Sequence, residues 1–297
     1  MKIKLFELLA VVIIFILVIG YLNSSNSSDV IIRVGSKDFT ESMIVAEIYA
    51  LALEDAGIKV ERVPAFASSL IIHQAMVDNQ IDVYPEYTGT GLLTILQRDL
   101  ITDPIEVYNT VKSEYAKQFQ ITWLDLTSAN DGQGIVIRTD VSKKYRIKTI
   151  SDLQKYAAEL RFCSQGHFDW RADGLPGLEA IYGPFDWKSS RVYDNGIKYD
   201  VLSSNEADAA PAYTTEGSLV NTDLFTLLED DKHAWPPYNL VPIVQFDALD
   251  AAPGIARALN NVGIRLDTAA LTSLNAQVDL DKRDIEKVAS DFYKSAS

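Results

Sequence analysis

The sequence of 297 residues contains a single cysteine, Cys163, and three histidines, His73, His167 and His233. One thiol cannot form an intrachain disulfide, so noncovalent contacts must hold the fold together. We expect Cys163 to pack as a small buried hydrophobic side chain. Structural metal sites draw their ligands mainly from cysteine and histidine, and here these residues are few and far apart in the sequence. The sequence therefore predicts neither a metal site nor a bound cofactor.

Signatures of enzymes and of nucleotide binding are also missing. The sequence has no GxxxxGK[ST] loop, no GxGxxG fingerprint and no GxSxG elbow. The TGTG stretch at 88–91 lacks the third glycine of a dinucleotide-binding turn. No local motif supports a Ser-His-Asp or Cys-His arrangement. We therefore predict a protein that is not an enzyme, with an exported enzyme as the alternative from another class.

Basic residues are the minority among the charged ones. Lysine and arginine number 27 against 41 aspartates and glutamates, and the formal net charge is −14. Such a surface repels nucleic acid and weakly attracts cations. We expect no nucleic-acid partner.

The first 28 residues differ in composition from the rest. Lys2 and Lys4 precede an apolar run of fifteen residues, 8–22, and the polar stretch NSSNSS follows at 23–28. This length suits a signal peptide and is short for a membrane span. We predict an export signal or an uncleaved anchor at 1–28, and no lipoprotein anchor, because no cysteine follows the run. The remainder should lie in the periplasm or another extracytoplasmic space and contact the membrane only through this segment.

After the leader, strand-like and helical patterns alternate. Strand patterns at 30–35, 58–63 and 81–84 enclose helical ones, which predicts a parallel α/β sheet with covered faces. Asp38 and Glu41 have the spacing of a capping box at the start of the first helix. In the helix expected at 68–79, the helical pattern runs through Leu70, Ile71 and Val77.

A second alternating region spans 150–229, followed by a strand at 239–246 and helices to the end. No repeat of 20–50 residues is present, which excludes solenoids. The pattern predicts two α/β lobes, one made of 30–131 plus 239–297 and the other of 132–238. Two crossings, near 127–132 and 236–240, would join them. Because ligands bind at the carboxyl ends of strands in such sheets, we expect YPEYTGT (84–90), at one strand end, to form a wall of a ligand pocket.

Five separated motifs occur in an order that carries a resemblance: VGSKDFTE (34–41), IDVYPEYTGTG (81–91), WRADGLPGLEAIYG (170–183), AYTTEGSL (212–219) and LEDDKHAWPPYNLVPIV (228–244). Together they resemble the substrate-binding proteins of ABC importers for quaternary amines such as glycine betaine, choline and carnitine. The resemblance implies a type II periplasmic-binding fold, with two lobes, a hinge and a central cleft. It also implies that the ligand is passed to the importer's permease subunits.

In that family a box of tyrosines holds the trimethylammonium group, and the motifs place Tyr87, Tyr213 and Tyr238 in this box. The fourth box position, before the strand GIVIR (134–138), is Gln133. This substitution indicates either a more polar amine or amino-acid-like ligand or a nearby ring, Trp170 or Trp235, that fills the gap. A quaternary ammonium has no hydrogen to donate, so electron-rich ring faces are its natural partners.

The resemblance assigns the carboxylate end of a zwitterionic ligand to Lys37, Thr90 and Arg171. Charge-assisted bonds of this kind are stronger than bonds between neutral groups. The predicted function is therefore capture of a small quaternary-ammonium or zwitterionic solute for import. A membrane-anchored sensor of the same fold is the other possibility that the sequence leaves open.

Overall fold

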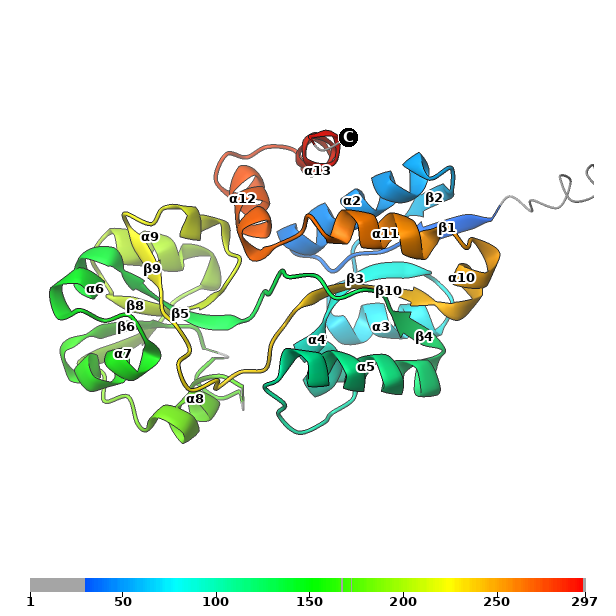
Figure 1. Ribbon diagram of the computed structural model, residues 1–297. Coiled ribbons are helices and arrows are strands. Elements are labelled where there is room, and N and C mark those ends of the chain that lie inside the picture. Colours follow the sequence, from blue (N-terminus) through cyan, green and yellow to red (C-terminus); the bar gives the residue numbers. More distant parts are fainter. Residues whose placement is uncertain (1–29, 167, 172, 296–297) are drawn as a thin grey trace, which may run out of the picture. The chain divides into compact units, whose positions relative to one another are not determined.

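The computed structural model describes residues 30–166, 168–171 and 173–295. Residues 32–297 form one compact unit, and this unit contains two five-stranded sheets with helices packed around each (Figure 1). The leader predicted at 1–28 lies outside the described residues. None of the helices within the described residues has the length and apolar character needed to cross a membrane.

The first sheet has the strand order β2-β1-β3-β10-β4. Its strands are β1 (Ile31–Val34), β2 (Lys59–Arg62), β3 (Val83–Tyr87), β4 (Ile121–Trp123) and β10 (Leu240–Gln245). The helical segments of this part of the chain are α2 (Thr40–Asp55), α3 (Ser69–Val77), α4 (Thr88–Thr90), the π-helical turn η1 (Gly91–Ile95), α5 (Pro104–Phe119), α10 (Phe246–Ala251), α11 (Ile255–Gly263), α12 (Thr268–Asp279) and α13 (Ile285–Lys294).

The second sheet has the strand order β7-β6-β8-β5-β9. Its strands are β5 (Gln133–Arg138), β6 (Arg161–Ser164), β7 (Ser189–Val192), β8 (Ala209–Tyr213) and β9 (Phe225–Leu227). The helical segments here are α6 (Thr139–Tyr145), α7 (Ile150–Tyr156), η2 (Ala157–Glu159), α8 (Leu175–Tyr182), η3 (Asn195–Ile197), α9 (Lys198–Ser203) and η4 (Gly217–Val220). Cys163 is buried in β6, as expected.

The α/β fold with two lobes is confirmed, but the expectation of parallel sheets is wrong in part. Strand β1 pairs parallel to β3, whereas β10 runs antiparallel to β3 and to β4. In the second sheet, β5 likewise runs antiparallel to β8 and β9. Both β5 and β10 follow crossings, and each begins opposite the end of its neighbour, Gln133 beside Tyr213 and Leu240 beside Tyr87. Because β5 and β10 each start at the edge of the sheet where the neighbouring strand ends, each must run antiparallel to that neighbour.

The two crossings are hydrogen-bonded to each other. Asn130 and Asn239 form an isolated antiparallel bridge. On either side of it, the Leu240 amide donates to the Ala129 carbonyl (3.0 Å) and the Asp131 amide donates to the Tyr238 carbonyl (3.1 Å). This ribbon is a short two-stranded connection. The exact lobe boundaries given above remain a prediction.

Helix α3 turns a different face to the core from the one that its apolar pattern suggested. Ile72 and Met76 are fully buried, whereas Leu70 is 59% exposed and Ile71 and Val77 are also exposed. Position 70 lies at a cavity described below. The pattern through Leu70, Ile71 and Val77 therefore predicted the wrong face of α3, because the face that contains Ile72 and Met76 is equally apolar.

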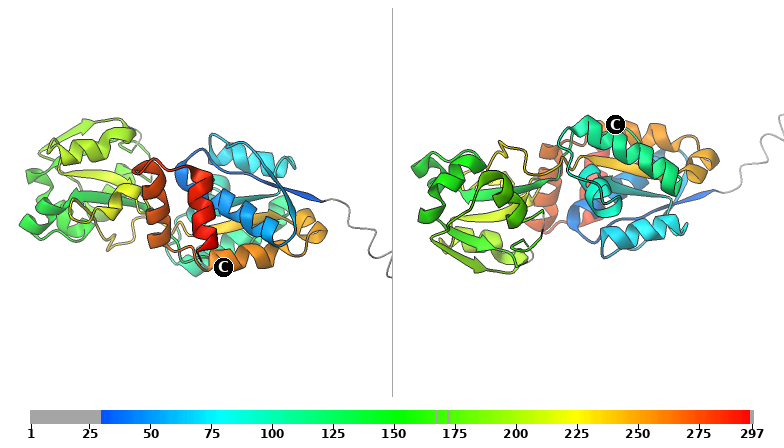
Figure 2. Two further views of the ribbon diagram at one scale, coloured as in Figure 1. Left: turned by 90° about the horizontal axis from the view of Figure 1, so that it is seen from above. Right: turned by 90° about the horizontal axis from the view of Figure 1, so that it is seen from below.

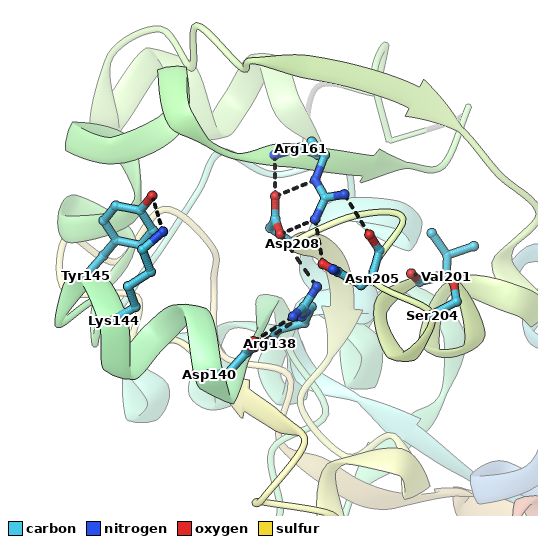
Figure 3. A network of polar contacts seen from close by, with 9 residues as sticks. All are labelled: Arg138, Asp140, Lys144, Tyr145, Arg161, Val201, Ser204, Asn205 and Asp208. Atoms are coloured by element: carbon cyan, nitrogen blue, oxygen red, sulfur yellow. Dashed lines mark hydrogen bonds and ion pairs between the residues drawn. The ribbon is translucent and has the colours of Figure 1, made fainter.

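The same anchoring device occurs at the start of β3 and at the start of β8. Arg161 donates from its main-chain amide and Nε (both 2.9 Å) and from Nη2 (2.6 Å) to Asp208, and from Nη1 to the Asn205 carbonyl (Figure 3). In the first sheet, Arg33 makes the same set of contacts to Asp82 and to the Asn79 carbonyl. Asn79 and Asn205 both have left-handed backbone conformations, with φ of 56° and 62°.

This structural likeness exposes a sequence repeat that periodicity analysis did not find. Residues 79–88 read NQIDVYPEYT and residues 205–214 read NEADAAPAYT. The two segments occupy equivalent positions in the two sheets, and each ends in a tyrosine at the end of its strand, Tyr87 or Tyr213. The two halves of the molecule thus present equivalent rings.

Candidate ligand-binding site

A cavity of about 770 Å³ is lined by residues from both sheets and from both crossings. The seven residues predicted from the motifs all line it: Lys37, Tyr87, Thr90, Gln133, Arg171, Tyr213 and Tyr238. Two features correct the expected local structure. The strand expected at 81–84 extends into YPEYTGT, since β3 ends at Tyr87. The turn expected after it is helical, and α4, which ends at Thr90, runs directly into the π-helical turn η1.

The three tyrosines reach the cavity from three different segments. The Tyr87 ring is 3% exposed, and its hydroxyl donates to Glu41 Oε1 at 2.8 Å. Tyr213 is 39% exposed. Tyr238 belongs to the second crossing, and a Cβ on Gly89 would come within 2.7 Å of its ring carbons. Only glycine at position 89 lets the backbone approach this ring so closely. Phe39 also lines the cavity, with its ring centroid 6.1 Å from that of Tyr87. It was not among the residues predicted from the motifs.

Gln133 lines the cavity at the position predicted for the fourth ring, and no tryptophan among the described residues lines the cavity with it. Its Nε2 donates to Asp173 Oδ2 at 3.2 Å. Trp170 is 73% exposed, and Trp235 is buried with its indole N–H donating to the Asp173 carbonyl at 2.8 Å. Neither tryptophan is among the residues that line the cavity. The suggestion that one of them fills the gap is therefore wrong, because Trp235 is committed to the core of the second sheet.

The two basic residues of the predicted carboxylate end each have an acidic partner within the protein. Lys37 Nζ donates to Glu86 Oε1, and both side chains are buried. Arg171 forms a bidentate pair with Asp173, through Nε at 2.7 Å and through Nη2. Such planar two-point pairing is the strong form of an arginine–carboxylate contact.

A cluster of polar residues at the cavity was missed by the motif analysis. Glu41 does not take part in a capping box: α2 starts after Phe39 with no side-chain cap, and the Glu41 carboxylate points to Tyr87 instead. Asn275 Nδ2, from α12, donates to Glu41 Oε2 and to the Thr215 carbonyl, both at 2.8 Å. The Thr215 hydroxyl donates to Asp131 Oδ1 at 2.6 Å. The signals available in the sequence were that Glu41 ends the motif VGSKDFTE (34–41) and that Asp131 lies two residues before Gln133.

Burial governs the protonation of this cluster. It raises the pKa of Glu41, against hydrogen bonds from Thr215, Tyr87 and Asn275 that favour the ionised form. Burial also raises the pKa of Asp131 well above its ordinary value, and the neighbouring Glu41 charge raises it further. Glu41 is buried and Asp131 is partly buried, and their mutual opposition to ionisation makes this end of the cavity a candidate functional site.

An α/β fold with two lobes, two crossings and a cavity at the strand ends defines a solute-binding protein. The sequence matches the OpuAC family, described as the substrate binding domain of ABC-type glycine betaine transport systems, over residues 31–295. The chain therefore belongs to this family. Its members are extracytoplasmic transport proteins and not enzymes, which confirms the predicted class.

Individual relatives agree with this assignment. The chain is 30% identical to the carnitine transport binding protein OpuCC of Listeria monocytogenes, over 90% of this chain and 87% of the relative. It is 30% identical to a glycine-betaine-binding protein of Pseudomonas aeruginosa, over 89% and 87%. A crystal structure of a glycine betaine/carnitine/choline ABC transporter protein superposes with a TM-score of 0.84 at 27% identity, over 89% and 98%.

Proposed function

We propose that the protein captures a small quaternary-ammonium compound outside the cytoplasm and delivers it to the permease subunits of an ABC importer. The main observation behind this proposal is that Tyr87, Tyr213 and Tyr238 all line one cavity. The relatives named above for glycine betaine and carnitine support the ligand class. Residues 8–22 would serve as the export signal or hold the protein at the membrane.

The energetics of such a site are sufficient for a scavenging importer. Each desolvated ring contributes about 1–2 kcal/mol to the binding of a quaternary cation. Three rings thus supply about 3–6 kcal/mol. Micromolar affinity corresponds to about 8 kcal/mol net, so polar contacts must supply the remainder and offset the cost of association. Tyr87 is held by its hydrogen bond to Glu41, so its ring is ordered before the ligand arrives.

A thermal-shift screen followed by calorimetry tests the function. Choline, glycine betaine and carnitine should include at least one compound that raises the melting temperature in a dose-dependent way, because binding to the native state alone stabilises it by mass action. The matched control is 3,3-dimethylbutanol, which has the shape of choline without its charge and should have no effect. If no quaternary ammonium compound raises the melting temperature or gives heat on titration, the proposed function is wrong.

Gln133 provides a second prediction at the same site. Replacing it by tyrosine should restore the fourth ring and tighten glycine betaine binding by about tenfold, the equivalent of about 1–2 kcal/mol of cation–π attraction. We expect weak glycine betaine binding in the unmodified protein, because the amide offers hydrogen bonds that a trimethylammonium group cannot use.

Calorimetry on the wild type, Gln133→Tyr and Gln133→Ala separates the possible causes. The alanine variant also loses the bond to Asp173, so a gain seen in both variants would come from freeing Asp173 and not from the ring. Sub-micromolar binding of glycine betaine by the wild type, with no gain in the tyrosine variant, would contradict this interpretation of the site.

A further inference from the structure

The carboxylates that line the cavity divide into those paired with a cation and those that are not. Asp173 pairs with Arg171, and Glu216 pairs with Lys198. Within the described residues, Glu41 and Asp131 have no ion pair, and their carboxylates accept hydrogen bonds from a phenol, an amide and a hydroxyl. Asp279, the fifth acidic residue of the lining, is exposed and accepts a bond from Thr40.

Glu41 and Asp131 form one cluster, although α2 supplies the first and a crossing supplies the second. The Thr215 hydroxyl donates to Asp131 and is also a hydrogen-bond partner of Glu41. A hydroxyl has one proton, so it can donate to only one carboxylate at a time. The other carboxylate lacks this donor unless it carries a proton itself or a donor arrives from outside.

Asn275 adds an unused acceptor to the cluster. Asn275 is 5% exposed, and its Nδ2 donates to Glu41 and to the Thr215 carbonyl. Its Oδ1 is buried with no hydrogen-bond partner, and the residue lines the cavity. A buried acceptor without a donor is costly, and a ligand that brings a donor recovers that cost.

Other charged groups face the cluster without neutralising it. The Lys37 charge lowers the pKa of Asp131 and the Glu216 charge raises it. Both residues are already in ion pairs, Lys37 with Glu86 and Glu216 with Lys198. The Tyr87 hydroxyl is a neutral donor. At this end of the cavity the uncompensated charge is therefore negative, and the free hydrogen-bonding atom is an acceptor.

We propose that Glu41 and Asp131 form a cation-selecting subsite that makes the protein prefer a quaternary ammonium alcohol, of the choline type, to the corresponding carboxylate-bearing zwitterion. This proposal rests on the proposed function. Both ligand types have the same trimethylammonium group, so the rings do not distinguish them. A ligand hydroxyl can donate to Asn275 Oδ1, whereas a ligand carboxylate meets two acids and an acceptor. Repulsion of the wrong charge is an effective way to obtain specificity.

The subsite also couples binding to protons, which gives a second readout. In the empty site burial raises the pKa of both carboxyl groups. A bound cation favours their ionised forms, so it lowers these pKa values and expels the proton that the pair holds. Choline affinity should therefore rise with pH through the range above the ordinary carboxyl pKa of about 4, and level off once the pair is ionised.

The test compares choline and glycine betaine by calorimetry on the wild type, Asp131→Asn and Asp99→Asn. Asp99 is exposed and does not line the cavity, so the last variant controls for the change in net charge. The wild type should bind choline at least about tenfold more tightly than glycine betaine and release protons, seen as a binding heat that depends on the ionisation enthalpy of the buffer. Asp131→Asn should weaken choline about tenfold and reduce the proton release, and Asp99→Asn should match the wild type.

The outcomes separate the two proposals. If both compounds bind the wild type and glycine betaine binds as tightly as choline, the cation-selecting subsite is refuted while the proposed function stands. The subsite is likewise refuted, and the proposed function stands, if Asp131→Asn binds choline as tightly as Asp99→Asn does. If neither compound, nor any other quaternary ammonium compound, binds the wild type, the proposed function fails and this inference fails with it. Melting curves of the unliganded variants establish that each is folded, and Glu41→Gln repeats the test from the other carboxylate.

Discussion

Replacing Lys37 by methionine should lower the free energy of unfolding by about 3–5 kcal/mol, the usual result of removing one partner from a buried ion pair. Glu86 is fully buried in β3 and accepts bonds from Lys37 Nζ, from its neighbour's main-chain amide on Tyr87 (2.7 Å) and from the Tyr84 hydroxyl (3.2 Å). Without the ammonium group, the carboxylate must stay charged in a buried position or take up a proton, and each of these costs free energy. Urea unfolding of the unliganded protein, followed by two independent probes, measures the loss.

The double variant Lys37→Met, Glu86→Gln is the matched control. It removes both charges, and the amide can still accept the bond from the Tyr87 amide, so it should recover most of the lost stability. If Lys37→Met alone stays within about 1 kcal/mol of the wild type, the pair contributes little and the argument from burial is wrong.

Replacing Gly217 by alanine should lower the free energy of unfolding by about 1–3 kcal/mol, because a methyl group there has no room. A Cβ at this position of η4 would lie 2.6 Å from the Ala276 nitrogen and 2.7 Å from the Ala276 Cα, both in the backbone of α12. Main-chain atoms within a helix cannot move aside as a flexible side chain can. Helix α12 packs against η4 and against α2, and it lies beside α13, the red helix near the C-terminus in Figure 2. It would therefore have to shift as a whole.

The same variant should also weaken ligand binding, because α12 carries Asn275 and a shift would break its bonds to Glu41 and to the Thr215 carbonyl. Unfolding curves and calorimetry with choline measure the two effects. Gly254→Ala is the control, since a Cβ there meets only a side-chain carbon at an ordinary 3.5 Å. Equal stability of the two variants would show that the contact between η4 and α12 is looser than the structure indicates.

The sequence was sufficient to predict the α/β class, the family and seven of the residues that line the cavity, because motifs keep their order and their spacing. It could not predict strand direction. The apolar runs of β5 and β10 look the same whichever way the strand runs, and the direction follows from a crossing between distant segments. Local spacing also failed to predict the role of Glu41. The sequence has the spacing of a capping box, but the Glu41 carboxylate accepts a hydrogen bond from Tyr87 instead of capping α2.

The pairing of charges was equally hidden in the sequence. Lys37 and Glu86 are 49 positions apart, and nothing in the local pattern of either residue indicates the other. The motif analysis therefore assigned Lys37 to a ligand carboxylate, and the structure shows that a protein carboxylate already occupies one of its hydrogen bonds. The role of Lys37 at the ligand remains a prediction.

The repeated segments NQIDVYPEYT and NEADAAPAYT show which residues this local structure requires. Both keep asparagine, aspartate, proline, tyrosine and threonine at the same positions, and in both halves the aspartate accepts hydrogen bonds from an arginine of the neighbouring strand. Where the first segment has Glu86, the second has Ala212. The second segment thus forms its strand, turn and ring with no carboxylate at the position of Glu86, so the Lys37–Glu86 pair is not required for this local structure. The two rings differ in their surroundings: Tyr87 is fixed by a buried hydrogen bond to Glu41, and Tyr213 is 39% exposed.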